Sequence, residues 1–401
     1  MSGCAKTMDV KSRSQRSGIS FGLREWSGAF GDIGTDLPLL AGMLMVSGMP
    51  PVRVLIVFGV LQMASGWIYR IPMAIQPLKA VAVLVIAQGI SYNIIVGSGL
   101  AIGLAMLVLT LSGGLQALAR LIPGSVVRGI QFGLGLKLCL LALQQYVGGQ
   151  GWEGWLLALA AAALMLSLAG QTRVPVGVLL IVLGAGAVLW GGVPFSTKWT
   201  VSGIADSWRI PLPSDVWTGF LLLALPQIPL SLGNSILATQ QLAEDWFPER
   251  GITVRKIGMG YSLFNIVAAL VGGVPVCHGS GGLAGHYALG GRTGGSVILY
   301  GAFYLGLGLA ISLGAHNVLA FFPLPILGVI LAREGFVLMA RLKTLADDPL
   351  GWKVAVLVGI LAAAVPNGFV IGTIAGTVLT AAARRMTAVS TVVSVAGTQS
   401  E

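Results

Sequence analysis

Residues 71–79 have the sequence Ile71-Pro72-Met73-Ala74-Ile75-Gln76-Pro77-Leu78-Lys79 and interrupt a hydrophobic region long enough to cross a bilayer. A second interruption, Val274-Pro275-Val276-Cys277-His278-Gly279-Ser280-Gly281-Gly282, follows about 200 residues later. Proline and clustered glycine prevent either region from forming one continuous helix. We therefore expect each region to be a short strand that leads into a half-helix. Two such interruptions are typical of membrane proteins built from inverted repeats, which bind their ligand between them.

The composition of the chain is that of an integral membrane protein. Of its 401 residues, 55% are hydrophobic and 9% are charged, and the mean hydropathy is +0.88. Soluble domains carry about 25% charged residues. Residues 1–20 are polar and basic and lack the apolar core of a signal peptide. The cysteines Cys4, Cys139 and Cys277 lack the spacing of a zinc site or a disulfide framework, so we expect no metal and no cofactor.

Hydrophobic runs divide residues 26–383 into about fourteen segments. The predicted fold is therefore an all-α polytopic membrane protein with about 14 transmembrane segments. Threading the segments back and forth places most of the 24 lysines and arginines on one face. Such a bias marks the cytoplasmic face, so we expect both termini to be cytoplasmic. The same bias accounts for the net charge of +10 without a nucleic-acid partner.

Proline positions suggest that the chain contains an internal repeat. Pro72 and Pro123 recur as Pro275 and Pro323, and a Val-Pro pair at residue 174 recurs at residue 365. Each copy would hold seven segments, and an odd number inverts the second copy in the membrane. The predicted organisation is a cytoplasmic tail (1–24), a first repeat (25–193), an extracellular linker (194–214), a second repeat (215–385) and a cytoplasmic tail (386–401).

The two half-helices of an inverted repeat would face each other with their N-termini near the bilayer centre. Helix N-termini carry free N–H groups and a partial positive charge, so together they favour an anion. We expect Gln76 to cap the first half-helix, Pro77 to lie in its first turn and Lys79 to add a full charge. On the second half-helix, Gly279, Ser280 and Gly281 would present backbone N–H groups and a hydroxyl. The alternative is that the glycines serve only helix packing and that Lys79 pairs with a nearby aspartate.

Two acidic residues lie in the first hydrophobic segment. Asp32, Thr35 and Asp36 would share one helix face, and intramembrane acids are commonly functional. Asp32 would neutralise Lys79, carry a coupling proton or do both, unless it forms only a structural ion pair. Asp36 is a second candidate for proton coupling.

The first hydrophobic segment of the second repeat, which corresponds to the one with Asp32 and Asp36, offers neutral polar side chains instead of acids. Gln227, Ser231 and Asn234 are suited to oxyanion oxygens and equally to helix–helix contacts. The lack of acids in this segment favours an anionic ligand over a cation or a nucleobase. His278 flanks the second interruption and is a third candidate for proton coupling, or a structural hydrogen-bond donor. Lys137 is another cation within a segment, and the sequence suggests no role for it.

Three motifs resemble those of the bacterial and plant molybdate-transporter family, which is related to the sulfate permeases. They are Phe30-Gly31-Asp32-Ile33-Gly34-Thr35-Asp36-Leu37-Pro38, Pro72-Met73-Ala74-Ile75-Gln76-Pro77-Leu78-Lys79-Ala80 and Pro275-Val276-Cys277-His278-Gly279-Ser280-Gly281-Gly282-Leu283-Ala284-Gly285. The resemblance implies a fourteen-segment fold with a core domain (about 26–112 and 215–313) and a gate domain (about 123–192 and 318–383). It also implies elevator-like movement of the core and, as is often found in the family, a homodimer through the gate helices. The expected location is the bacterial inner membrane.

The expected function is secondary active transport of a tetrahedral oxyanion, with molybdate first and sulfate second. Coupling to protons through Asp32 is a further hypothesis, and the sequence leaves the coupling ion open. The protein would not be an enzyme. One alternative is a sulfate-specific permease. Another is a nucleobase–proton symporter, which would need a carboxylate beside the half-helices. An intramembrane serine protease would need a base within reach of Ser280, and none is evident. A passive channel would share the same kind of site.

Overall fold

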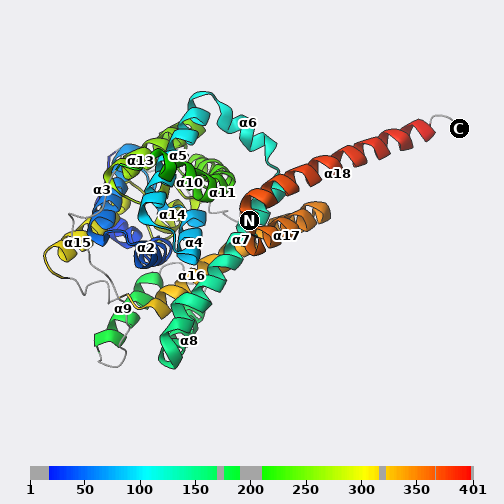
Figure 1. Cartoon of the computed structure of the whole chain (residues 1–401). Helices are drawn as coiled ribbons and strands as arrows, with labels where there is room; N and C mark the ends of the chain where they lie inside the picture. The colour runs from blue at the N-terminus through cyan, green and yellow to red at the C-terminus, as the bar shows by residue number, and fades with distance from the viewer. Residues whose placement is uncertain (1–17, 169–175, 190–209, 316–321, 366, 399–401) are drawn as a thin grey trace, which may run out of the picture.

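The computed structural model describes residues 18–168, 176–189, 210–315, 322–365 and 367–398, and these residues are mostly helical (Figure 1). Most of the predicted extracellular linker and of the predicted N-terminal tail lies outside them, as do Val174, Pro175 and Pro366 of the proposed repeat. The last helix continues through most of the predicted C-terminal tail, to Thr398.

The N-terminal half of the chain forms helices with one short strand between the third and the fourth. They are α1 (Leu23–Ala29), α2 (Ile33–Ser47), α3 (Pro51–Tyr69), β1 (Gln76–Pro77), α4 (Lys79–Gln88), α5 (Tyr92–Leu111), α6 (Gly114–Leu121), α7 (Gly124–Leu141), a π-helical continuation at Ala142–Val147, a 3₁₀ turn at Gly148–Gln150, α8 (Gly151–Ser167) and α9 (Val176–Leu189).

The C-terminal half has a comparable order, with one span divided into short pieces. The elements are α10 (Pro213–Gly219), a π-helical piece at Phe220–Ala224, α11 (Leu225–Leu230), a second at Ser231–Leu237, α12 (Ala238–Trp246), a 3₁₀ turn at Pro248–Arg250, α13 (Val254–Val271), β2 (Val276–Cys277), α14 (Ser280–Ala288), α15 (Gly295–Ser312), α16 (Leu324–Ala340), a 3₁₀ turn at Arg341–Leu345, α17 (Pro349–Ala364) and α18 (Gly368–Thr398).

The two strands pair with each other and connect the two halves of the chain. They are antiparallel, with Gln76 opposite Cys277 and Pro77 opposite Val276. The Leu78 N–H extends the pairing by donating to the Pro275 carbonyl at 3.0 Å. Proline is tolerated in β1 because a two-stranded sheet consists only of edges. The short strands and half-helices expected from the sequence are therefore present, at the centre of the fold.

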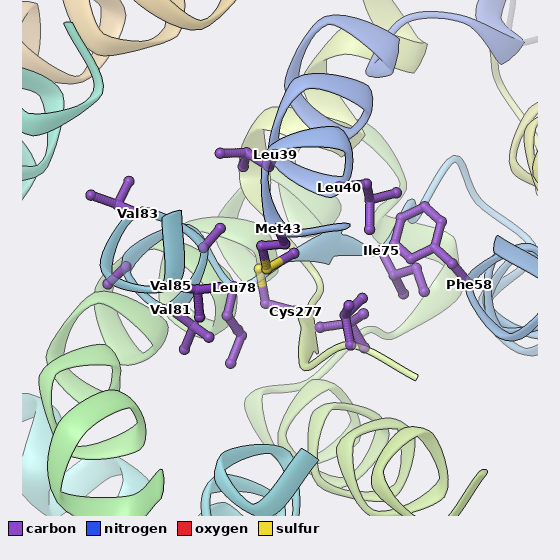
Figure 2. Close-up of a cluster of buried hydrophobic side chains, with 14 of the residues drawn as sticks. Leu39, Leu40, Met43, Phe58, Ile75, Leu78, Val81, Val83, Val85 and Cys277 are labelled. Atoms are coloured by element: carbon purple, nitrogen blue, oxygen red, sulfur yellow. The ribbon is translucent and has the colours of Figure 1, made fainter. Parts of the chain in front are cut away.

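Hydrophobic side chains from several helices bury the strand pair (Figure 2). Leu39, Leu40 and Met43 come from α2, while Ile75 and Cys277 come from the strand regions themselves. All five are almost fully buried. Backbone polar groups in such surroundings must find partners within the protein, because water cannot reach them to form hydrogen bonds.

The helices form two groups (Figure 1). In the larger group, α3 packs along α15 and α5 packs along α13 and α10. In the other group, α7 packs against α16 and α17, and α18 packs on α17 and extends away from the rest of the molecule. The groups meet where α16 contacts α2 and where α4 contacts α7.

Glycine allows the closest of these helix contacts. A Cβ atom added to Gly59 of α3 would lie 2.6 Å from the Gly301 carbonyl oxygen of α15. One added to Gly301 would lie 2.5 Å from the Gly59 carbonyl oxygen. Only residues without a side chain permit two backbones to approach this closely, as is common between membrane helices.

Length and hydropathy alone identify six membrane-spanning helices in the part of the chain that the structure describes, or seven if α1 and α2 form one bent span. The α1–α2 pair is bent by 40°. Several other apolar helices, such as α4 and α17, are too short for this criterion. The fold is a multi-pass helical membrane fold, as predicted, while the number of about fourteen segments stays a prediction.

Candidate functional site

The N-termini of α4 and α14 lie at the strand pair, because each helix begins directly after its strand. α4 begins at Lys79 with Leu78 as its N-cap, and α14 begins at Ser280 with Gly279 as its N-cap. Neither N-cap side chain bonds to its helix. The first N–H groups of both helices therefore point out of the helices near the junction of the two halves of the chain.

The expected roles of Gln76 and Pro77 in the first half-helix are wrong. Both residues belong to β1, and Leu78, at φ −61° and ψ 111°, is still extended. The helix starts later than predicted because the pairing with β2 continues through Leu78. Lys79 is therefore the first helical residue and does not lie one turn inside the helix.

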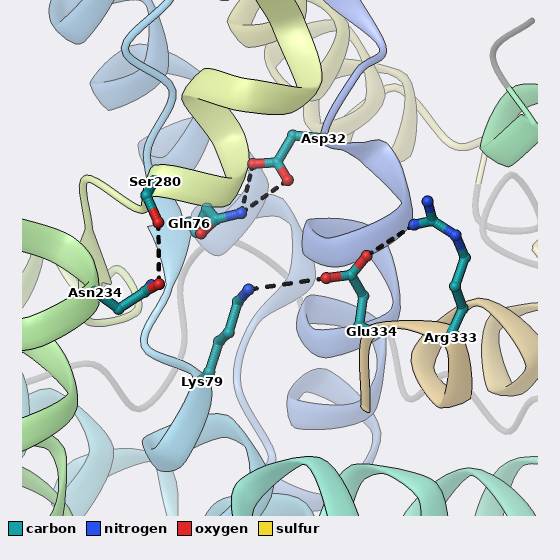
Figure 3. Close-up of polar contacts among 7 residues, drawn as sticks. All are labelled: Asp32, Gln76, Lys79, Asn234, Ser280, Arg333 and Glu334. Carbon is teal, nitrogen blue, oxygen red and sulfur yellow. Dashed lines mark hydrogen bonds and ion pairs between the residues drawn. The ribbon is translucent and has the colours of Figure 1, made fainter. Parts of the chain in front are cut away.

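Gln76 contacts Asp32 instead of capping a helix (Figure 3). Its Nε2 atom donates to Asp32 Oδ1 at 2.7 Å and to Oδ2 at 2.8 Å, and both residues are buried. Asp32 is the N-cap residue of α2, at the bend after α1, so it does not lie within a continuous helix as expected. Both hydrogen bonds of the Gln76 amide nitrogen go to this one carboxylate, so a ligand at Nε2 would share the donor with Asp32.

Lys79 forms an ion pair with Glu334 and not with Asp32 (Figure 3). Lys79 Nζ lies 3.9 Å from Glu334 Oε2, and the two side chains are 7% and 16% exposed. Glu334 Oε1 also lies 3.1 Å from Arg333 Nη1. Glu334 was not among the site residues predicted from the sequence. A carboxylate inside the hydrophobic segment that forms α16 was the sequence signal that could have identified it. Because Glu334 lies beside Lys79, the surroundings of the half-helices are not free of acids.

Gln227 and Asn234 hold the two half-helices from the neighbouring span. Gln227 Oε1 accepts the Ala80 N–H at 2.9 Å and so caps α4 from outside. Its Nε2 atom donates to Ser231 Oγ at 3.0 Å. Ser280 Oγ donates to Asn234 Oδ1 at 3.0 Å (Figure 3). This partner of Ser280 is an amide oxygen and not a base.

Three glycines of the second half-helix bring its backbone against the side chains of the first half of the chain. A Cβ atom at Gly279 would overlap Gln76 Oε1, and one at Gly282 would lie 2.7 Å from Asp32 Oδ2. At Gly281 the same atom would have room, 3.7 Å from Gln76 Nε2 and 3.9 Å from Lys79 Nζ. Gly281 is also exposed. An accessible space at Gly281 thus faces an amide donor, an ammonium group and a helix N-terminus.

The remaining candidates lie beside this space or away from it. Thr35 is buried in the first turn of α2, where its N–H donates to the Asp32 carbonyl at 2.9 Å. Asp36 Oδ2 accepts from the Tyr300 hydroxyl at 3.1 Å and from Gln62 Nε2 at 3.5 Å. His278 is enclosed by Tyr69 and Phe264, and neither of its ring nitrogens has a hydrogen-bond partner among the described residues.

Lys137 takes no part in these contacts and lies beside an aromatic ring instead. Its Nζ atom lies over the Phe369 ring, 5.5 Å from the ring centroid, between α7 and α18. It provides a matched lysine outside the candidate site.

Comparison with solved structures shows the fold. The transmembrane domain of the cyanobacterium bicarbonate transporter BicA aligns with a TM-score of 0.65 and 17% identity, over 88% of this chain and 99% of that one. The murine anion transporter Slc26a9 in its inward-facing state aligns with a TM-score of 0.65 and 10% identity, over 91% of this chain and 69% of that one. At these identities the likeness concerns the fold alone.

Comparison of sequences shows the family. A family model described as "Molybdate transporter of MFS superfamily" matches residues 24–138 and 219–338. Molybdate transporter 1 of Arabidopsis thaliana is 30% identical over 78% of this chain and 78% of its own length. Molybdate transporter 1 of Chlamydomonas reinhardtii is 27% identical over 91% of this chain and 92% of its own. These relatives are transporters, which confirms that the protein is not an enzyme. The chain belongs to the molybdate transporter family.

Proposed function

We propose that this protein is a secondary active transporter for a tetrahedral oxyanion, with molybdate as the first substrate and sulfate as the second. The observation that carries the proposal is the space at Gly281, which faces Lys79 Nζ and Gln76 Nε2 at the N-termini of two paired half-helices. An oxyanion there would receive a full charge, amide donors and two helix dipoles. The names of the curated relatives favour molybdate over sulfate.

The binding residues in this proposal have different roles. Lys79, Gln76 and the backbone around Ser280 and Gly281 would contact the anion. Gln227 and Asn234 would position the two half-helices through Ala80 and Ser280. Pro77, Gly279 and Thr35 would shape the site without donating to the ligand.

We also propose an inverted 7+7 repeat. Support comes from the equivalent placing of β1 and β2 and of α4 and α14 in the two halves. The larger helix group would be the core, and the group of α7, α16, α17 and α18 would be the gate. Elevator-like movement of the core past the gate would expose the site alternately to the two sides, in a bacterial inner membrane with both termini cytoplasmic. The gate helices would form the homodimer contact.

Proton coupling, as part of this proposal, is assigned to Asp32. Its carboxylate contacts Gln76 directly, so its protonation would change the donor that faces the anion. Asp36 bonds to Tyr300, and His278 lies between two aromatic rings, so neither contacts the proposed ligand groups. An inward proton gradient should then accelerate uptake.

Uptake of labelled molybdate into proteoliposomes tests the function. Saturable accumulation against a gradient, stimulated by an inward proton gradient, is the expected result. Unlabelled sulfate should compete and uracil should not. Absence of saturable molybdate or sulfate uptake would contradict the proposal, and equilibration without accumulation would indicate a channel. Competition by uracil would instead favour the nucleobase symporter, for which Asp32 and Glu334 would be the required carboxylates.

A further inference from the structure

The ion pair between Lys79 and Glu334 joins the two helix groups (Figure 3). Lys79 begins α4 in the larger group, while Glu334 lies on α16, which packs against α7. This contact therefore links a group of the proposed anion site to the other helix group.

We propose that Glu334 is an internal counter-ion of Lys79 that a bound oxyanion must displace. This inference rests on the anion site proposed above. Before the anion binds, the Glu334 carboxylate pairs with the Lys79 ammonium group and links α4 to α16. When the anion binds, it pairs with Lys79 in place of Glu334, and the link between the helix groups is released.

Charge is the first argument for displacement. A tetrahedral oxyanion such as molybdate carries two negative charges, and Glu334 carries one. Both cannot share one ammonium group without strong repulsion at distances of a few ångströms, in surroundings where both side chains are largely buried. Asp32 adds a further negative charge on the other side of Gln76. The carboxylate that can leave Lys79 is Glu334, because the two lie 3.9 Å apart. Asp32, in contrast, accepts two shorter, buried hydrogen bonds from Gln76, at 2.7 and 2.8 Å.

The second argument for displacement is that Glu334 has another cation, Arg333, beside it. Arg333 Nη1 already lies 3.1 Å from Glu334 Oε1, closer than Lys79 lies to Oε2. The Arg333 side chain is 56% exposed, so it can follow the carboxylate toward solvent. When Glu334 leaves Lys79 it therefore keeps Arg333 as its partner, and its charge is not left unpaired. The exchange gives the anion a direct effect on the contact between α4 and α16.

Affinity measurements on purified protein test the exchange. Titration calorimetry with molybdate should show tighter binding by Glu334→Gln, by about tenfold, because the competing charge is removed. Arg333→Gln should bind more weakly than wild type, because Glu334 then remains on Lys79. Glu244→Gln, an exposed acid on α12, is the control and should not change the affinity.

A double-mutant cycle distinguishes displacement from a general change of charge. In a Lys79→Gln background, Glu334→Gln should give much less gain than in wild type, because the competition is for Lys79. An equal gain in both backgrounds would overturn the inference, as would unchanged or weaker binding by Glu334→Gln. If Glu334→Gln does not fold, Arg333→Gln is compared in wild type and in the Lys79→Gln background, and an equal loss of affinity in both would overturn the inference.

The outcomes also separate this inference from the proposed function. Wild type that binds and transports molybdate, with Glu334→Gln at the same affinity, would refute only the counter-ion. Wild type that neither binds nor transports molybdate or sulfate would refute the anion site and the counter-ion together.

Discussion

Gln62 and Asn265 make the same pair of backbone hydrogen bonds in the two halves of the chain. Gln62 donates to the Ile75 carbonyl at 2.7 Å and accepts the Ile75 N–H at 3.0 Å. Asn265 donates to the Val276 carbonyl at 2.7 Å and accepts the Val276 N–H at 3.0 Å. Each amide therefore supplies the strand region with the partners that a third strand would otherwise provide.

Replacing either amide with a hydrocarbon should destabilise the protein. Gln62→Leu leaves the N–H and carbonyl of Ile75 buried without partners, at a cost of about 2–5 kcal/mol. Asn265→Leu should cost a similar amount. Thermal unfolding in detergent measures the effect, with Gln241→Leu as an exposed control. Equal melting temperatures for Gln62→Leu and Gln241→Leu would contradict this interpretation.

Lys79 should dominate the affinity for the anion. Lys79→Gln removes a charged donor, and we expect molybdate binding to weaken by about 10–100-fold. Lys137→Gln removes a lysine that lies over the Phe369 ring and should leave binding unchanged. Calorimetric titration of both variants checks this. A similar loss in both would show that only the overall charge matters.

Gly279 and Gly281 should respond differently to the same small change. Gly279→Ala places a methyl group onto Gln76 Oε1, so both the stability and the affinity should fall. Gly281→Ala has room for the methyl group and should fold normally, but it fills the space beside Lys79 Nζ. We expect it to weaken binding without lowering the melting temperature. Normal molybdate affinity in Gly281→Ala would place the anion elsewhere.

Glu25 should anchor the first described helix to α15. Its carboxylate is buried and accepts the N–H groups of Arg292 and Thr293 at 3.0 Å and of Ser296 at 3.1 Å, at the start of α15. Glu25→Ala should cost about 2–4 kcal/mol, since it leaves these donors unpaired at a helix N-terminus. Glu249, whose side chain is 49% exposed, serves as the control through Glu249→Ala. Melting temperatures that change equally in the two variants would refute the anchor.

The membrane fold and the place of the candidate site were both predictable from local sequence. Pro72, Pro275 and the glycines after His278 mark the two interruptions, because proline and clustered glycine disfavour a continuous helix wherever the chain places them. Hydrophobic composition indicated the multi-pass helical architecture in the same way. These signals act within a few residues, and no tertiary contact reverses them.

The contacts that complete the site were not predictable from local sequence. Leu78 stays extended because its N–H reaches the Pro275 carbonyl, so the first half-helix begins two residues later than Gln76 and Pro77 suggested. Glu334 meets Lys79 because α16 packs on α2 at the junction of the helix groups. Both contacts join distant parts of the chain, and one sequence without its packing does not contain that information.

The pairing of β1 with β2 also limits how the two half-helices can move. A few buried backbone hydrogen bonds between the strands join the N-terminal tips of α4 and α14. If one tip tilted alone, these hydrogen bonds would break and leave buried backbone groups without partners. In the elevator-like movement proposed above, an anion between the two tips would therefore cross with its surroundings unchanged, and its release would depend on which side of the membrane the site faces.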